Sequence, residues 1–203
     1  MDIAIVDYGV GNLRSAQKAI EHGGHEAVIT ADAAVLRAAP RIILPGVGAF
    51  GAAITQLRES GLDDVVMDAA RSGKPVLGIC LGMQLLLSKG YELGEWDGLG
   101  LVPGDVVKFD APGLKIPQIG WNTIEPTGTS PLLNGVDDGM MFYFVHSFYC
   151  RPADAAAIGG TTEFGGPYCS VIASGNIHGA QFHPEKSGKA GLRFLKNFAE
   201  LPS

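Results

Sequence analysis

Short strands alternate with helical segments through the first half of the chain, and this alternation restricts the fold more than any other feature. Apolar, β-branched runs predict four strands, at residues 3–6, 26–30, 41–44 and 75–79. Helical spacing of apolar residues predicts helices between them, at residues 12–22, 31–38, within 51–72 and at 81–88. Alternating strands and helices build βαβ units. We therefore expect an α/β protein with a doubly wound, mostly parallel sheet covered by helices on both faces.

The second half of the chain has a different pattern, rich in turns and short strands. Residues 90–139 contain many Gly and Pro residues and no convincing helix. Residues 140–150 predict one apolar, aromatic strand, and residues 161–182 predict two or three short antiparallel strands. Residues 189–201 predict a closing helix. Since no linker interrupts this length, we expect a single domain over residues 1–203, in which a β-rich half packs on the α/β half.

Composition argues against several classes of function. The chain has 15 Lys and Arg residues against 21 Asp and Glu, a net charge of −6, which disfavours a nucleic-acid-binding protein. The longest apolar stretch, residues 75–87, is broken by glycines and is shorter than the roughly 20 residues of a membrane span. The N-terminus lacks the basic region of a signal peptide, so we expect a cytoplasmic protein without membrane association. Cys80, Cys150 and Cys169 lack CxxC spacing, which predicts free thiols and no bound metal.

The sharpest chemical feature is the segment Gly78-Ile79-Cys80-Leu81-Gly82, where a predicted strand meets a predicted helix. This is the nucleophile-elbow pattern with cysteine in the place of serine. The two glycines leave room for the crowded backbone of a tight turn. At a helix N-terminus the dipole favours the thiolate, and the Leu81 N–H points toward an incoming oxyanion. The alternative is a buried cysteine between packing glycines, which the alignment of strand, glycines and helix makes less favourable.

A cysteine nucleophile needs a base, and the base needs a carboxylate that orients it. Among the five histidines, His183 fits best, because a proline and then Glu185 follow it. We predict an extended segment there, in which residues two apart point the same way and Glu185 holds the His183 ring. His146 lies in the aromatic strand, and His178 has no carboxylate nearby in the sequence. A solvated loop histidine is the alternative for His183, and the presence of Cys80 argues against it.

A glycine-flanked loop, Pro45-Gly46-Val47-Gly48, follows the third predicted strand. In a doubly wound sheet, ligands bind beyond the carboxyl ends of the strands, and Cys80 also follows a strand end. The N–H groups of such a loop can form an anion-binding nest, while an ordinary turn is an equally good interpretation of the loop alone. The other glycine pair, Gly9-Val10-Gly11, lacks the third glycine of a dinucleotide fingerprint, so we expect no nucleotide site there.

Two segments together resemble the class I, or triad, glutamine amidotransferases. They read Gly-Ile-Cys-Leu-Gly-Met-Gln at 78–84 and Gln-Phe-His-Pro-Glu-Lys-Ser at 181–187. The loop at 45–50 and the blocks at 7–14, 119–122 and 142–147 narrow the resemblance to the glutaminase branch that serves imidazole glycerol phosphate synthase, in histidine biosynthesis. The resemblance covers essentially the whole chain and implies a flavodoxin-like version of the doubly wound fold.

The resemblance also implies an activity and a partner. The family hydrolyses L-glutamine to glutamate and ammonia, without a metal or an organic cofactor. In this branch the ammonia passes to a partner cyclase subunit, with which the glutaminase forms a heterodimer. The cyclase makes imidazole glycerol phosphate and aminoimidazole carboxamide ribotide.

Individual residues acquire expected roles in the same way. By the family's motifs Cys80 attacks the side-chain amide, His183 shuttles the proton and Glu185 orients His183. The N–H groups of Leu81 and, after a loop rearrangement, Val47 bind the oxyanion. Two further groups are implied, one that binds the substrate and one that contacts the cyclase. The substrate-binding residues are Gly48, Gln84, Glu92 and Ser147. The cyclase-contacting residues are Asn12, Trp121, Tyr143 and Lys186.

Two other interpretations stay open from the sequence. Another class I glutaminase, feeding anthranilate, carbamoyl phosphate or pyridoxal phosphate synthesis, would share the chemistry, and the Pro-Gly-Val-Gly loop argues against it. A non-enzymatic, flavodoxin-like chaperone or redox sensor with a reactive Cys80 is the second. Such a sensor needs no carboxylate-oriented base, so the His183 and Glu185 pair argues against it.

Overall fold

The first half of the protein forms the parallel sheet that the alternation predicts. The computed structural model describes residues 1–128, 130–137 and 139–202. Five strands pair in parallel, in the order β2 (Ala27–Thr30), β1 (Ile3–Val6), β3 (Ile42–Gly46), β4 (Val76–Cys80) and β14 (Ile177–Ala180). The last of these comes from the far end of the chain. This strand order is that of doubly wound, flavodoxin-like folds and confirms the predicted α/β architecture.

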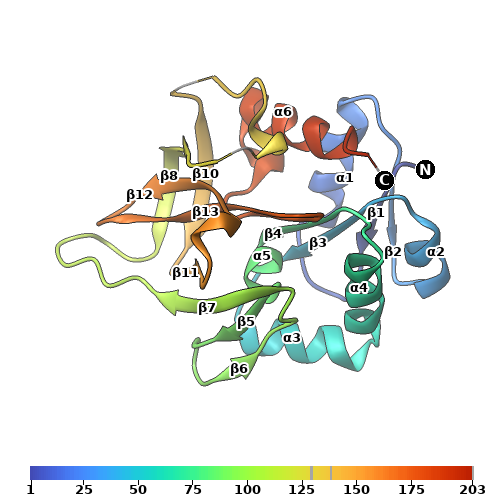
Figure 1. The fold of residues 1–203 in the computed structure, drawn as a ribbon, viewed down its shortest axis with the longest axis horizontal. Coiled ribbons are helices and arrows are strands. Elements are labelled where there is room, and N and C mark those ends of the chain that lie inside the picture. The colour runs from blue at the N-terminus through green and yellow to red at the C-terminus, as the bar shows by residue number, and fades with distance from the viewer. Residues whose placement is uncertain (129, 138, 203) are drawn as a thin grey trace.

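Helices cover both faces of the parallel sheet (Figure 1). One face carries α1 (Leu13–His22) and α6 (Gly188–Ala199), and the other carries α2 (Ala33–Ala38), α3 (Phe50–Glu59), α4 (Leu62–Arg71) and α5 (Leu81–Leu85). Strand β1 shows how the two cores form. Ile3 and Ile5 pack with α1 and α6, whereas Ala4 and Val6 pack with the helices opposite. Because side chains alternate across a strand, a strand buried on both faces is apolar throughout.

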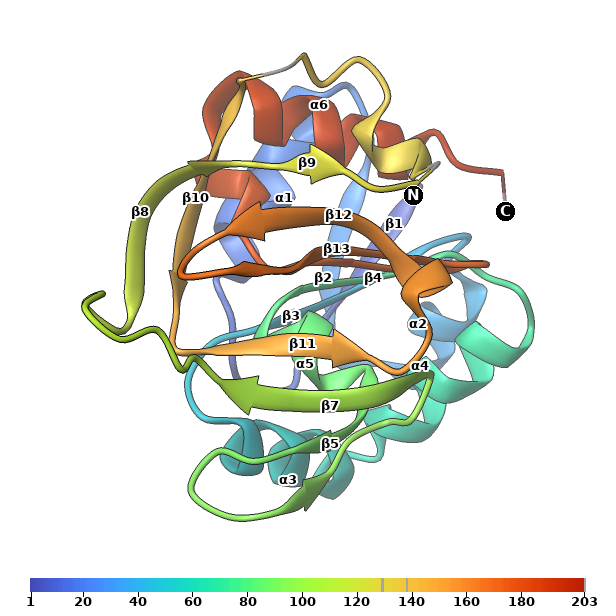
Figure 2. The ribbon, with the colours of Figure 1, turned by 60° about the vertical axis from the view of Figure 1, so that its left-hand side comes forward.

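The second half extends the sheet with mostly antiparallel strands (Figure 2). From β14 the sheet continues through β13 (Pro167–Ser174), β11 (Phe148–Pro152), β7 (Val102–Lys108), β5 (Leu87–Gly90) and β6 (Trp96–Asp97). The strands off this path are β12 (Ile158–Glu163), which pairs with β13, and β9 (Glu125–Pro126), which pairs with β12. A separate two-stranded sheet joins β8 (Gln118–Thr123) to β10 (Met141–His146). Three short 3₁₀ helices complete the described elements, η1 (Pro131–Leu133), η2 (Ala155–Ala157) and η3 (Pro184–Lys186).

Two predicted elements are wrong in their extent. The helix expected over residues 81–88 ends at Leu85, and Leu87 already begins β5. The apolar leucine run fits a helix or a strand equally well. Leu87 pairs with Val102 of β7, so the sheet pairing decides for a strand. The single strand expected over residues 140–150 is two strands in different sheets, because the chain bends at Ser147 between β10 and β11.

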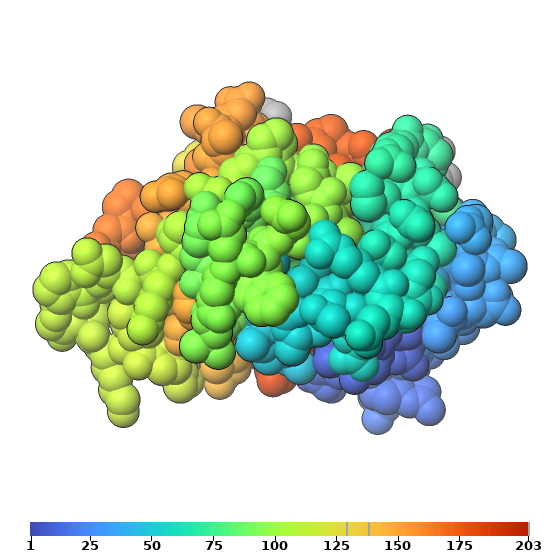
Figure 3. All heavy atoms as spheres, turned by 90° about the horizontal axis from the view of Figure 1, so that it is seen from below, coloured from blue at the N-terminus to red at the C-terminus, as the bar shows by residue number. Residues whose placement is uncertain are grey.

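The segment after β5 packs against α3 and so closes one side of the molecule (Figure 3). The Trp96 ring lies on Gly51 of α3, where an added Cβ would come within 2.3 Å of it. The Glu92 carboxylate accepts a hydrogen bond of 2.7 Å from the Phe50 N–H at the start of α3. These contacts hold Glu92 beside the carboxyl ends of β3 and β4. No helix within the described ranges is both long enough and apolar enough to cross a membrane.

Candidate active site

The segment from Gly78 to Gly82 forms a tight turn that presents Cys80 at the end of β4. Cys80 has φ +54° and ψ −111°, a backbone conformation that residues other than glycine rarely adopt. Both flanking glycines are required by close packing. A Cβ on Gly78 would lie 2.6 Å from the Met83 backbone, and a Cβ on Gly82 would lie 1.9 Å from the Leu44 carbonyl oxygen. The thiol therefore stands at a strained strand-to-helix junction, as the elbow pattern predicts.

The structure brings His183 and Glu185 together in the way a catalytic base requires. His183 Nδ1 lies 3.0 Å from Glu185 Oε1, and these side chains are only 4% and 2% exposed. The backbone of His183 is held at both ends, since its N–H donates to the Tyr143 carbonyl and its own carbonyl accepts from the Ser187 hydroxyl. A buried carboxylate at this distance fixes the ring orientation and stabilises the imidazolium.

The local conformation that produces this pair differs from the prediction. The sequence suggested an extended segment, whereas residues Pro184–Lys186 form the 3₁₀ turn η3 and only His183 itself is extended. Proline favours the first position of a helical turn because its φ is already suitable and it has no N–H to satisfy. Glu185 thus reaches the His183 ring across a turn and not along one face of a strand.

Two histidines at the site have opposite electrostatic environments. Burial lowers the pKa of His183, but hydrogen bonds and charge interactions with Cys80 and Glu185 outweigh it and raise the pKa to about 9. Burial lowers the pKa of His146 to about 4, although its hydrogen bond to the Phe148 carbonyl acts in the other direction. At neutral pH His183 is therefore an imidazolium beside Cys80, and His146 is neutral.

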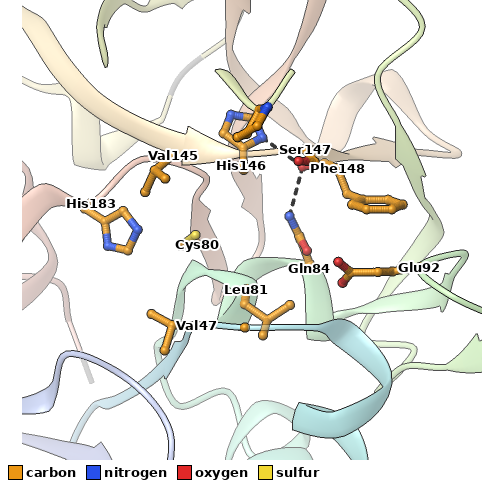
Figure 4. Close-up of a pocket in the computed structure, with 12 residues that line it drawn as sticks. Val47, Cys80, Leu81, Gln84, Glu92, Val145, His146, Ser147, Phe148 and His183 are labelled. Carbon is orange, nitrogen blue, oxygen red and sulfur yellow. Dashed lines mark hydrogen bonds between the residues drawn. The ribbon is translucent and has the colours of Figure 1, made fainter. Parts of the chain in front are cut away.

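A cavity of about 330 Å³ opens beside Cys80 (Figure 4). In this view Cys80 lies between His183 on one side and Gln84 and Glu92 on the other. The volume suits a small amino-acid substrate. The lining residues come from both halves of the chain and are Val47, Gly48, Cys80, Leu81, Gln84, Glu92, Pro117, Val145, His146, Ser147, Phe148 and His183.

The cavity gathers all of the residues expected to bind substrate or the oxyanion. Leu81 and Val47, with the four substrate-binding candidates, line its wall. Gln84 is buried and donates from Nε2 to the Phe148 carbonyl at 3.0 Å and to Gln181 Oε1 at 3.1 Å. Gly48 has φ +94°, which frees the peptide beside Val47 to rotate at low steric cost. The placement is compatible with the expected roles, which stay predictions.

Sequence reasoning gave no role in this wall to Pro117, Val145 or His146. His146 Nδ1 lies 2.8 Å from the Phe148 carbonyl, and its Nε2 lies 3.2 Å from the Tyr168 hydroxyl. The Tyr168 hydroxyl is also 2.9 Å from the side-chain amide of Gln118. The available signal for His146 was the spacing of two in β10, which puts it on the same buried face as Phe142 and Phe144. Nothing local in the sequence predicted that the Phe148 carbonyl accepts from Gln84, because this contact joins residues 64 apart.

The four residues expected to contact a partner lie near one another, close to His183. The Trp121 and Tyr143 rings are 5.8 Å apart in an edge-to-face arrangement. Lys186 Nζ lies 5.9 Å above the Tyr143 ring. Asn12 Nδ2 donates to Glu185 Oε1 at 3.4 Å. These residues are therefore placed to connect an exposed surface with the His183 and Glu185 pair.

Within residues 1–128, 130–137 and 139–202, there is no cluster of three or more His, Cys, Asp or Glu side chains that could hold a metal ion. The three cysteines are buried and form no disulfide with one another.

The chain matches the protein family described as glutamine amidotransferase class-I over residues 4–201. It belongs to the class I glutamine amidotransferases. The amidotransferase is 49% identical over 201 residues to imidazole glycerol phosphate synthase subunit HisH of Rhodopirellula baltica, an alignment that covers 98% of each chain. It is 47% identical to the subunit of the same name from Chlorobaculum tepidum, over 98% of this chain and 100% of the relative.

Solved structures support the same fold at lower identity. The structure of PurLQS from Thermotoga maritima superposes with a TM-score of 0.77 at 21% identity and covers 97% of this chain and 96% of the other. A crystal structure of a glutamine amidotransferase superposes with a TM-score of 0.74 at 18% identity and covers 99% of this chain and 100% of the other. The family membership confirms an enzyme and contradicts the alternative of a non-enzymatic cysteine sensor.

Proposed function

We propose that this amidotransferase is the glutaminase subunit of imidazole glycerol phosphate synthase. It hydrolyses L-glutamine to glutamate and ammonia. The ammonia passes to a cyclase subunit that makes imidazole glycerol phosphate and aminoimidazole carboxamide ribotide in histidine biosynthesis. The observation that supports the reaction most is the Cys80, His183 and Glu185 arrangement at a cavity of suitable size. The near-complete alignment with HisH subunits at 47–49% identity supports this branch over other class I glutaminases.

The proposed reaction starts with a thiolate and an imidazolium. Cys80 Sγ attacks the side-chain amide carbon of glutamine, and the carbonyl oxygen becomes an oxyanion. The Leu81 N–H stabilises this charge, and the Val47 N–H joins it once the loop turns inward. His183 then protonates the departing nitrogen, so the C–N bond breaks and ammonia leaves a thioester on Cys80. Since the pKa of His183 is raised to about 9, the ring holds this proton at neutral pH.

Thioester hydrolysis completes the proposed cycle. Neutral His183 takes a proton from water, and the resulting hydroxide attacks the thioester carbon. The C–S bond breaks, glutamate leaves, and the proton on His183 restores the imidazolium beside the thiolate. Glu185 keeps Nδ1 of the ring occupied throughout, so that the other ring nitrogen serves the reaction.

We place the cyclase on the exposed face formed by β8 and β10. Ile119 is 63% exposed and Trp121 is 52% exposed, and both point outward from β8. Tyr143 stands opposite Trp121 in the strand register, and exposed Met141 is its neighbour along β10. Exposed aromatic and aliphatic side chains of this kind favour a protein interface. The face borders Lys186 and His183, so a partner bound there lies next to the site where ammonia forms.

The test uses the purified chain together with its cyclase. Cys80→Ala abolishes synthesis from glutamine, while free ammonia at high concentration still supports the cyclase, because only the glutaminase step uses the thiol. Cys150→Ala is the matched control, since this buried cysteine lies in β11 outside the cavity and its loss leaves glutamine turnover near normal. Near-normal glutamine turnover by Cys80→Ala would overturn the proposal.

A further inference from the structure

Gln181 is a fully buried polar residue whose side chain faces the sulfur of Cys80. It lies between β14 and His183 and is 0% exposed. Its Nε2 lies 3.9 Å from Cys80 Sγ, within hydrogen-bond range for a sulfur acceptor. An amide side chain is rarely buried without a reason, since an unpaired donor or acceptor there is costly.

The orientation of the Gln181 amide follows from its neighbours. The backbone carbonyl of Phe148 can only accept, so Gln84 must turn its NH₂ group toward it, at 3.0 Å. The second N–H of the same Gln84 nitrogen then reaches the Gln181 side chain at 3.1 Å, which requires an oxygen there. With Oε1 taken in this way, the NH₂ group of Gln181 has to face Cys80. The alternative flip of either amide would place two donors or two acceptors against each other.

His146 donates to the Phe148 carbonyl, which sets the orientation of the Gln84 and Gln181 amides. Its Nδ1 lies 2.8 Å from the Phe148 oxygen and must carry the proton, because the carbonyl cannot donate. Nε2 lies 3.2 Å from the Tyr168 hydroxyl, which itself donates to Gln118 Oε1 at 2.9 Å. Since burial lowers the pKa of His146 to about 4, the neutral ring keeps this arrangement at neutral pH. The Phe148 carbonyl is thus held by two donors, one from β10 and one from α5.

We propose that Gln181 is a further catalytic residue, which donates an amide N–H to Cys80 Sγ and stabilises the thiolate. Gln84 orients this amide from the opposite side. The inference rests on the proposed function, in which Cys80 is the nucleophile. A hydrogen bond to an ionised acceptor is shorter and stronger than one to a neutral acceptor. The contact therefore favours the thiolate over the thiol, and it adds a neutral donor to the positive charge of His183.

The other titratable groups around Cys80 leave His183 as the main source of charge. Burial raises the pKa of Tyr8 and of Tyr168 and raises that of Cys150 well above its ordinary value, so these three are neutral at neutral pH. His146 is neutral for the reason given above. The two carboxylates nearby are Glu185, behind His183, and Glu92, on the far wall of the cavity. The Gln181 amide can be distinguished from these titratable groups, because an amide does not ionise and its effect on Cys80 does not change with its own protonation.

The test measures the reactivity of Cys80 without glutamine. Iodoacetamide alkylates the holoprotein across a range of pH, and the modified Cys80 peptide is quantified by mass spectrometry. Gln181→Met keeps the length of the side chain but has no donor. We expect its alkylation rate at pH values below the midpoint of the parent profile to fall roughly tenfold, which corresponds to a hydrogen bond to a charged group at the weak end of its range. We expect Gln84→Met, which leaves Gln181 unoriented, to lower the rate by a smaller factor.

The shape of the pH profile separates this role from a structural one. Loss of a thiolate donor slows alkylation at pH values below the midpoint of the parent profile and leaves the rate at high pH, where the thiol is fully ionised, close to that of the parent protein. A repacked or blocked site slows alkylation by the same factor at every pH, and that result would overturn the proposal, as would an unchanged profile. Ser170→Ala is the control, because this fully buried hydroxyl bonds Thr162 and is not among the partners of Cys80.

Glutamine turnover with the cyclase is measured in parallel on the parent protein. If turnover is absent there but the alkylation profiles behave as expected, the proposed function fails while the role of Gln181 at the sulfur stands. If turnover is normal and Gln181→Met alkylates like the parent protein, only the further inference fails.

Discussion

We expect His178 to make the stability of the protein sensitive to acid through a mechanism independent of catalysis. The residue lies in β14 and points at the α6 side of the sheet, with its ring 6.4 Å from that of Phe198. It is buried, and its Nδ1 has no hydrogen-bond partner among the residues that the structure describes. Burial lowers the pKa of His178 to about 4. We expect His178→Leu, which fills similar space without a titratable group, to remove this sensitivity.

The size and sign of the effect follow from proton linkage. Above pH ~6.5, the ordinary pKa of histidine, the ring is neutral in both the folded and the unfolded chain and contributes little pH dependence. As the pH falls from ~6.5 toward 4, His178 binds a proton in the unfolded chain but stays neutral in the folded protein, so the free energy of unfolding decreases. For a folded pKa of about 4, the loss reaches about 2–3 kcal/mol at pH 4.5.

Urea unfolding followed by circular dichroism at pH 7 and pH 4.5 measures this loss. The parent protein should lose about 2–3 kcal/mol more between the two pH values than His178→Leu does. At pH 7 the variant should be at least as stable as the parent, because the substitution also removes a buried nitrogen that has no partner within the described part of the chain. An equal pH dependence for the two proteins would show that His178 is not held neutral in the folded state.

Three further predictions concern the active site. His183→Ala should lower glutamine turnover in the complex roughly 10²–10⁴-fold through lost proton transfer, whereas His178→Leu should not, and equal losses would remove the special role of His183. Gly82→Ala should lower the melting temperature and the activity, because its Cβ would lie 1.9 Å from the Leu44 carbonyl, and a variant with normal melting would contradict the packing argument. Val47→Pro, which lacks the N–H, should cut cyclase-stimulated turnover roughly 10²–10³-fold and basal turnover less, whereas Val47→Ala should be mild; intact stimulation in Val47→Pro would refute the loop switch.

Local patterns in the sequence were sufficient wherever neighbouring residues alone decide the conformation. The parallel strands of the first half were predictable because strands buried on both faces are short, β-branched and separated by helices. The elbow at Cys80 was predictable because its geometry depends on the glycines directly before and after the turn. The approach of Glu185 to His183 was also expected, although the turn that produces it was not.

Strand pairing between distant segments decided the elements that local patterns did not predict. Strands β5, β7 and β8 form in segments with helical or turn-like composition, because their partners are distant in the sequence and supply the hydrogen bonds. The bend at Ser147 matters for the same reason, since it sends β10 and β11 into different sheets.

The wall of the active site depends on these distant pairings. Gln84 meets the Phe148 carbonyl across 64 residues and Gln181 across 97 residues, and Gln181 meets Cys80 across 101. Each amide in this chain has two possible orientations, and neither the residue nor its neighbours in the sequence selects one. The backbone carbonyl of Phe148 selects it, because a carbonyl can only accept, and only the folded chain brings that carbonyl to Gln84.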